Sequence, residues 1–186
     1  MRIGTIGTGI VAQTLAAKQA DQKQDVMIGT RDIAQTLDRS ALDIYGNPPF
    51  RVWHEQHPDV QFGTFADAAA HGELVLNATA GAVSLEALNL AGAEHREGKM
   101  LMDVANPLGF SKGMPPSLEV CNTDSLAKRV QRAYPGTWVV KTLNTVSARL
   151  MANPRELADG DHHVFVSGND AEAKAQVTNL LMSWFG

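Results

Sequence analysis

The sequence predicts an α/β fold in which helices cover both faces of a doubly wound parallel sheet. Short apolar runs alternate with longer segments of helical periodicity along the chain, which is typical of βαβ units. The apolar runs lack polar alternation, as expected of parallel strands that are covered on both faces. Together these two observations indicate three layers, with a sheet between two layers of helices.

Short apolar segments are the predicted strands, and they span residues 3–6, 26–29, 60–62, 74–78, 100–104, 138–143 and 164–166. Segments with apolar residues at helical spacing are the predicted helices, at 10–20, 84–91, 124–133 and 171–184. Thr123 is expected to cap the helix at 124–133. The core face of the last helix is expected to consist of Ala175, Val177, Leu180, Leu181 and Trp184.

Two segments interrupt this alternation. Residues 38–63 contain Asn47-Pro48-Pro49 and are predicted to form an irregular crossover with one short helix before the strand at 60–62. Residues 107–121 are rich in Gly and Pro and directly follow a predicted strand. They are expected to form a long loop that covers a ligand.

Composition excludes several classes of protein. The 186 residues are 44% hydrophobic and 19% charged, so residues 1–186 are expected to form one globular domain. A net charge of −4 without a basic cluster argues against nucleic-acid binding. The one cysteine, Cys121, forms no intrachain disulfide and fits a reducing compartment. No apolar run approaches the roughly 20 residues that span a bilayer, and no secretory signal is found, so we expect a cytoplasmic protein without membrane contact. The six histidines lack metal-ligand spacing, and no metal site is predicted.

A Gly-rich motif follows the first predicted strand and opens the first predicted helix. Its sequence, Gly7-Thr8-Gly9-Ile10-Val11-Ala12, has the pattern G-x-G-x-x-A. Gly7 permits a tight turn, Gly9 lets a pyrophosphate approach the main chain, and Ala12 keeps the helix close to the strand. Free N–H groups at the helix N-terminus then bind phosphate oxygens. The motif predicts a Rossmann-like dinucleotide site, the alternative being a turn without a ligand.

The second predicted strand ends in the sequence Gly29-Thr30-Arg31-Asp32. NAD sites usually carry a carboxylate about 20 residues after the Gly-rich motif, and Thr30 stands there instead. Thr30 can donate a hydrogen bond, and Arg31 can make a paired contact with a phosphate. The sequence therefore favours NADP as the cofactor, the alternative being that Arg31 is an ordinary surface residue.

Three other strand ends carry small or amide residues at the edge where open α/β sheets bind ligands. They are Ala78-Thr79-Ala80, Asn106 and Asn144. The small residues would let a cofactor lie against the main chain, and the two amides are expected at its nicotinamide end. Ordinary turn chemistry accounts for each Asn equally well, since Asn-Pro is itself a turn signal.

These motifs resemble the NADP-binding family of coenzyme F420-dependent NADP oxidoreductases, and the cytosolic domain of STEAP ferric reductases is similar. The resemblance rests on the Gly-rich motif, Ile28-Gly29-Thr30-Arg31 and Lys141-Thr142-Leu143-Asn144-Thr145. It implies that NADPH passes a hydride to a deazaflavin or flavin ring. The phosphate contacts it implies are Thr8, Gly9, Ile10, Val11, Thr30 and Arg31, and the ribose contacts are Ala78, Thr79 and Ala80.

The sequence departs from the family in three respects, the first being the unfamiliar segment from Phe110 to Pro116. A second cation often follows the arginine, and Gln35 and Thr36 stand in that stretch here. Family members also continue into a final strand and helices that we expect to be missing after residue 186. We expect an NADP-dependent oxidoreductase with a small hydride acceptor, F420 or a flavin, and a homodimer. No catalytic side chain is predicted, so a carbonyl or imine reductase and an NADP-sensing regulator without turnover stay open as alternatives.

Overall fold

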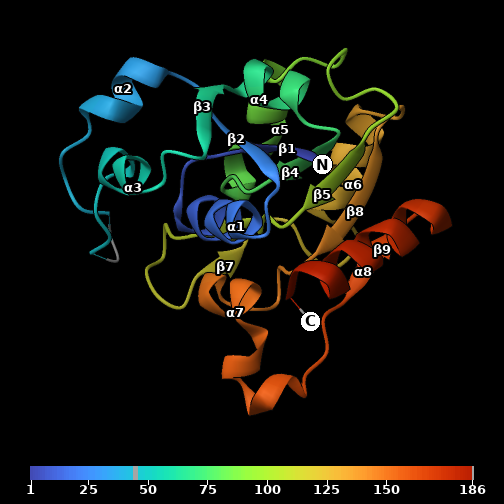
Figure 1. The fold of residues 1–186 in the computed structure, drawn as a ribbon. Helices are drawn as coiled ribbons and strands as arrows, with labels where there is room; N and C mark the ends of the chain where they lie inside the picture. The colour runs from blue at the N-terminus through green and yellow to red at the C-terminus, as the bar shows by residue number, and fades with distance from the viewer. Residues whose placement is uncertain (44–45, 186) are drawn as a thin grey trace.

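The computed structural model describes residues 1–43 and 46–185. The chain folds around a seven-stranded sheet (Figure 1). The strand order is β3-β2-β1-β4-β5-β8-β9. The strands are β1 (Arg2–Ile6), β2 (Asp25–Thr30), β3 (Gln61–Thr64), β4 (Leu74–Asn77), β5 (Met100–Asp103), β8 (Trp138–Thr142) and β9 (Val166–Gly168). Every neighbouring pair from β3 to β8 is parallel, which confirms the doubly wound α/β fold. Residues 44–45, inside the predicted crossover, and Gly186 lie outside the described residues.

Helices cover both faces of the sheet and complete three layers. One face carries α1 (Ile10–Asp21), α3 (Phe50–Gln56), α7 (Ala148–Ala152) and α8 (Ala171–Phe185). The other carries α4 (Phe65–His71), α5 (Ser84–Leu90) and α6 (Leu126–Ala133). Strand residues alternate between the two cores, because successive side chains point to opposite faces. Leu74 and Leu76 thus belong to one apolar cluster, and Val75 belongs to the other.

Several short helices connect the larger elements. The helix α2 (Ile33–Asp38) stands beyond β3 together with α3 (Figure 1). The 3-10 helix η1 (Gly81–Val83) precedes α5, and η2 (Pro154–Glu156) and η3 (Ala158–Gly160) follow α7. Among the described residues, no helix combines the length and the apolar character that crossing a bilayer requires.

The structure corrects the prediction for the last strand. It begins at Val166 rather than Val164, and it runs antiparallel to β8 at the edge of the sheet. An edge strand has one neighbour only, so three residues suffice, and Phe165 just before it is 66% exposed. The predicted core face of α8 was wrong at one position: Ala175 is exposed and Ala173 is buried instead.

Three other predictions need correction. Residues 107–121 do not form a loop without structure, because β6 (Leu108–Gly109) and β7 (Ser117–Leu118) pair as a small antiparallel hairpin. The helix predicted at 124–133 begins at Leu126, and its cap is Ser125 rather than Thr123. Ser125 Oγ accepts from the N–H of Lys128 at 3.2 Å, which satisfies one of the free donors at the helix start.

We predict that Ser125→Ala lowers the free energy of unfolding by about 1 kcal/mol, because the N–H of Lys128 loses its acceptor. Thr123→Ala is the matched control, since it removes a hydroxyl of an exposed residue outside the helix and should change stability by less than about 0.5 kcal/mol. Urea unfolding of both variants measures the difference. Equal losses would contradict the observed cap.

Candidate functional site

The candidate site begins at the turn between β1 and α1, where the sheet changes its winding direction. The chain leaves β1 toward β2, while β4 lies on the opposite side of β1, so the loops after β1 and β4 face each other. Gly7 has φ +119°, and a Cβ there would lie 2.8 Å from the carbonyl oxygen of Ala78. Only glycine allows this approach of the two loops.

Gly9 leaves open space above the start of α1. No described atom lies within 4 Å of a Cβ built at this position. Gly9 is the N-cap residue, and within the described chain no side chain caps the helix. The first N–H groups of α1 therefore have no side-chain acceptor and can bind an anion. Gln13 fixes the turn, because its Nε2 donates to the carbonyl of Thr8 at 2.8 Å.

A groove of about 310 Å³ joins most of the predicted cofactor residues. It runs from the Gly-rich turn to the ends of β2 and β4, and this volume is in the range of small-molecule sites. The structure brings together residues that are separated by up to about 70 positions in sequence. The predicted residues that line the groove are Gly7, Thr8, Gly9, Thr30, Arg31, Ala78, Thr79 and Ala80.

Arg31 is accessible to a ligand. Its side chain is 52% exposed, and its Nη2 lies 3.2 Å from Oε1 of Glu86 on α5. An exposed pair of this kind contributes little to stability, so a phosphate can compete with Glu86 for the guanidinium.

Thr30 is placed differently from the expectation of a free donor. Its hydroxyl is buried and lies 2.7 Å from the hydroxyl of Thr36. Thr36 Oγ1 donates to the carbonyl of Asp32 at 2.7 Å, so the shared proton between the two threonines comes from Thr30. A hydrogen bond from Thr30 to a phosphate would require this pair to rearrange.

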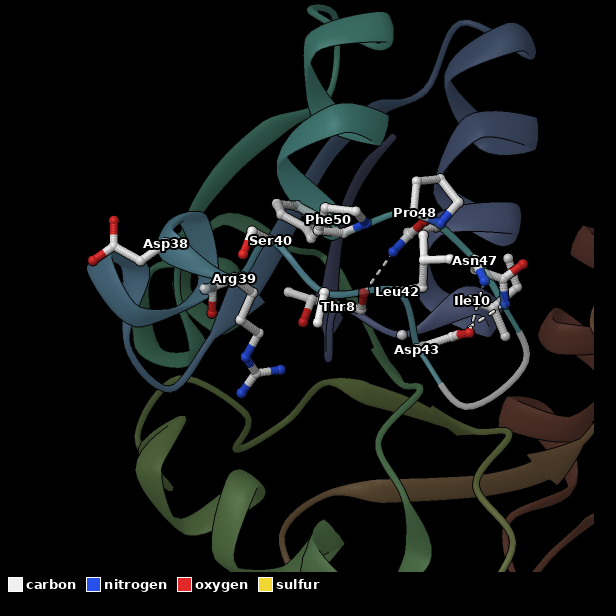
Figure 2. Close-up of a pocket in the computed structure, with 15 residues that line it drawn as sticks. Thr8, Ile10, Asp38, Arg39, Ser40, Leu42, Asp43, Asn47, Pro48 and Phe50 are labelled. Atoms are coloured by element: carbon white, nitrogen blue, oxygen red, sulfur yellow. Dashed lines mark hydrogen bonds between the residues drawn. The ribbon is translucent and has the colours of Figure 1, made fainter.

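A second hollow of about 560 Å³ continues from the groove on the side of α3. The two share Thr8, Gly9, Thr36 and Arg39. Figure 2 shows the Arg39 side chain on the same side as Thr8, whereas the carboxylate of Asp38 points away. Ile10 lines this second hollow. Arg39 directly follows α2 and therefore supplies a second cation to the groove. The second cation that often follows the arginine in the family is thus present, although Gln35 and Thr36 occupy the stretch where it was expected.

Three predicted residues, Val11, Asn106 and Asn144, line neither the groove nor the second hollow. Val11 packs against the apolar cluster under α1, so its main chain is the part that remains for a ligand. Asn106 and Asn144 are bonded to each other: Asn106 Nδ2 donates to the carbonyl of Asn144 at 2.7 Å, and Asn144 Nδ2 donates to Asn106 Oδ1 at 3.3 Å. They join the loops after β5 and β8.

A row of polar residues lies beneath these loops, and the sequence analysis missed it. Asn77, Asp103 and Lys141 are register partners on β4, β5 and β8, so their side chains share one face of the sheet. Lys141 Nζ lies 3.1 Å from Asp103 Oδ2, and Asn77 Nδ2 donates to Asp103 Oδ1 at 2.9 Å. Asp103 is fully buried, and the Lys141 side chain is 17% exposed. Burial lowers the pKa of the Lys141 ammonium, while Asp103 opposes that shift.

One signal in the sequence could have found this row. Asp103 and Lys141 each end an otherwise apolar strand segment, Met100-Leu101-Met102 and Trp138-Val139-Val140. A buried charge needs a partner, and neighbouring parallel strands supply one at the same level. Arg39 gave no such signal, since only the turn after α2 brings it back to the groove. Within the described residues, no group of three or more His, Cys, Asp or Glu is arranged to hold a metal ion.

The comparison with protein families identifies the chain. The family described as NADP oxidoreductase, coenzyme F420-dependent, matches residues 2–107, which is more than half of the sequence. The chain belongs to this family of NADP-dependent oxidoreductases, and its cofactor is NADP. The resemblance inferred from the Gly-rich motif and from the end of β2 is thereby confirmed.

The chain is also similar to individual proteins. A candidate F420-dependent NADP reductase from Arthrobacter sp. FB24, known from a crystal structure, is 54% identical with a TM-score of 0.92, covering 99% of this chain and 80% of that one. Metalloreductase STEAP3 of Rattus norvegicus is 25% identical over 180 residues, or 96% of this chain, and the chain spans 31% of that relative. An imine reductase of Streptomyces aurantiacus is 16% identical with a TM-score of 0.65, covering 98% of this chain and 52% of the reductase, and it shares the fold.

We predict that Gly9→Val abolishes NADPH binding and leaves the fold intact. Gly9 has φ −74° and ψ 176°, which valine adopts readily, and the new side chain enters open space. That space is where a pyrophosphate would approach the helix N-terminus, so we expect an affinity loss of at least about a hundredfold. Calorimetric titration with NADPH measures it, and Gly9→Ala should give a smaller loss. Binding of the folded Val variant at the wild-type affinity would place the phosphates elsewhere.

Proposed function

We propose that the chain binds NADPH along the groove over Gly9 and transfers its hydride to a small planar acceptor, a deazaflavin such as F420 or a flavin. One observation carries the proposal: the N-terminus of α1 has no side-chain cap and faces open space at the switch point of the sheet. Two arginines line the groove together with residues 78–80 after β4, and the loop after β5 contacts the residue that follows them, Gly81. This is the arrangement that a dinucleotide with one extra phosphate requires.

The adenosine end is held by charge. Arg31 and Arg39 line the same groove, and each offers a planar set of N–H donors to the 2′-phosphate. Asp32 is turned to another task, because its Oδ1 accepts from the N–H of Gln35 and caps α2. It therefore does not take the place of the carboxylate that binds a ribose 2′-OH in NAD sites.

The nicotinamide end is held by small residues and closely approaching loops. Ala78, Thr79 and Ala80 line the groove after β4. Gly81 N–H donates to the carbonyl of Asn106 at 3.1 Å, and a Cβ at Gly81 would lie 2.4 Å from that oxygen. The bound dihydronicotinamide supplies the hydride, and this chain supplies position and exclusion of water. No side chain is assigned as a general acid or base.

We predict that NADPH binds more tightly than NADH and that Arg31 carries most of the difference. Arg31→Ala should weaken NADPH about ten- to hundredfold, since a charge-assisted hydrogen bond contributes about 1.5–3 kcal/mol, and should leave NADH nearly unchanged. Arg39→Ala should weaken NADPH by a smaller factor. Glu86→Gln removes the carboxylate that competes for Arg31 and should strengthen NADPH a few-fold at most.

Dissociation constants of both dinucleotides at fixed salt measure this preference. Arg51→Ala is the matched control. Arg51 is an exposed arginine on α3, and its substitution changes the net charge by the same amount. An Arg31→Ala protein that keeps the wild-type ratio of the two constants would contradict the assignment of Arg31.

Turnover separates the proposed function from the alternatives. The protein is mixed with NADPH and, in parallel, with F420, FMN or a cyclic imine, and the loss of NADPH absorbance is followed. We expect oxidation with F420 or FMN, and Gly9→Val should remove it. Oxidation with the imine alone would favour an imine reductase. Tight NADPH binding without turnover by any acceptor would favour a sensor and would contradict the proposed reaction.

A further inference from the structure

The loops at the nicotinamide end are fixed from below by a continuous polar network that spans three strands. The network starts at Lys141 on β8, passes through Asp103 on β5 and reaches Asn77 on β4. Each of these strands ends within one residue of its polar member and continues directly into a loop of the candidate site. The network thus lies at the junction between the sheet and the loops of the candidate site.

The loop after β5 is tied to both charges. Lys141 Nζ donates to the carbonyl of Ala105, and the N–H of Ala105 donates to Asp103 Oδ1 at 3.2 Å. Ala105 is therefore bonded through its carbonyl and its N–H, so the peptide groups on both sides of it have little freedom to rotate. Asn106 follows immediately and joins the loop after β8 through its bonds with Asn144.

The loop after β4 is tied through Asn77. Its Oδ1 accepts from the hydroxyl of Thr79 at 2.8 Å, and its Nδ2 donates to Ser84 Oγ at 3.2 Å. Thr79 and Ser84 also lie 2.7 Å apart through their hydroxyls. Because Thr79 lines the groove, any shift of Asn77 would be felt at the surface that faces the cofactor.

Stability alone does not explain a charged pair at this level of the sheet. Two positions earlier on the same three strands, the register partners on the same face of the sheet are Val75, Leu101 and Val139. These residues are apolar and buried. Replacing a buried ion pair by packed apolar residues is often neutral or stabilising, so continuing the apolar row would have served the core. What an apolar row lacks is a set of directed bonds to the peptide of Ala105 and to Thr79.

We propose that Lys141, Asp103 and Asn77 are positioning residues that set the nicotinamide end of the groove and leave the adenosine end unaffected. The inference rests on the proposed function, because it assumes that NADPH lies along the groove. None of the three side chains lines the groove itself, so they act through Ala105, Asn106 and Thr79. The adenosine end depends instead on Arg31 and Arg39, which belong to the segment after β2.

The test compares the whole cofactor with its adenosine half. Lys141→Met should raise the dissociation constant of NADPH about tenfold, slow hydride transfer to FMN or F420 at saturating NADPH, and leave the affinity for 2′,5′-ADP within about twofold. A general loosening of the fold would weaken NADPH and 2′,5′-ADP in parallel. The split between the two ligands is therefore the signature of positioning.

Lys99→Met is the matched control. Lys99 is also a half-buried lysine whose Nζ donates to main-chain carbonyls, those of Ala69 at 2.9 Å and Gly72 at 2.7 Å. It directly precedes β5 and therefore lies at the amino ends of the strands, whereas the site lies at their carboxyl ends. Its loss should lower stability without separating NADPH from 2′,5′-ADP.

A second variant covers the case in which Lys141→Met does not fold, since it leaves the Asp103 carboxylate buried without its cation. Lys141→Met combined with Asp103→Leu removes both charges together and should show the same split between the ligands. Parallel losses for the two ligands, or wild-type affinity and transfer rate in the folded variant, would overturn the inference alone. A wild-type protein that binds neither NADPH nor 2′,5′-ADP would overturn the proposed function and the inference with it.

Discussion

The whole site depends on the close contact between the turn after β1 and the loop after β4. At Gly7 the two main chains approach so closely that a Cβ would lie 2.8 Å from the Ala78 carbonyl oxygen. This contact brings α1 to the edge of the sheet with its first N–H groups facing the open space over Gly9. The strand order places that helix end between the loops after β2 and β4, so one groove reaches both arginines and small residues. Without the contact at Gly7 these parts would not face one ligand.

The two ends of the groove use charge in opposite ways. At the end proposed for the adenosine, the cations are exposed, and Arg31 pairs with Glu86, a partner that it can exchange for an anion. Such interactions are long-range and are screened by salt. At the end proposed for the nicotinamide, Asp103 is fully buried and Lys141 is mostly buried, and the two are paired with each other. Lys141 and Asp103 are hydrogen-bonded to each other and to the main chain of Ala105, so they fix the loop around them. The first arrangement is suited to recognising a phosphate and the second to holding a geometry.

The features that local sequence patterns determine could be predicted from the sequence. The strands and the Gly-rich turn follow from periodicity and from the needs of a phosphate, and the structure confirms the fold that they predict. Sequence reasoning missed what depends on register or on a short connection. Charged residues at the ends of apolar strand segments mark Asp103 and Lys141 in the sequence, but their pairing with each other and with Asn77 depends on the strand register. The return of Arg39 to the groove through the turn after α2 has no such sign in the sequence. The cap of α6 was misplaced by two residues because Thr123 and Ser125 are both favoured cap residues by type, and the backbone decides where the helix begins.

The separation of the two ends also explains why no catalytic side chain emerged from the sequence. A reaction in which the cofactor carries the hydride needs distance and orientation from the protein, and small errors in position reduce the rate strongly. Groups that supply position work best when they are buried, bonded on all sides and remote from the reacting atoms. Asp103 and Asn77 meet that description, since both are fully buried and bonded to the neighbouring strand and to the loops. In this site the residues that control the reaction are therefore expected beneath the groove rather than in it.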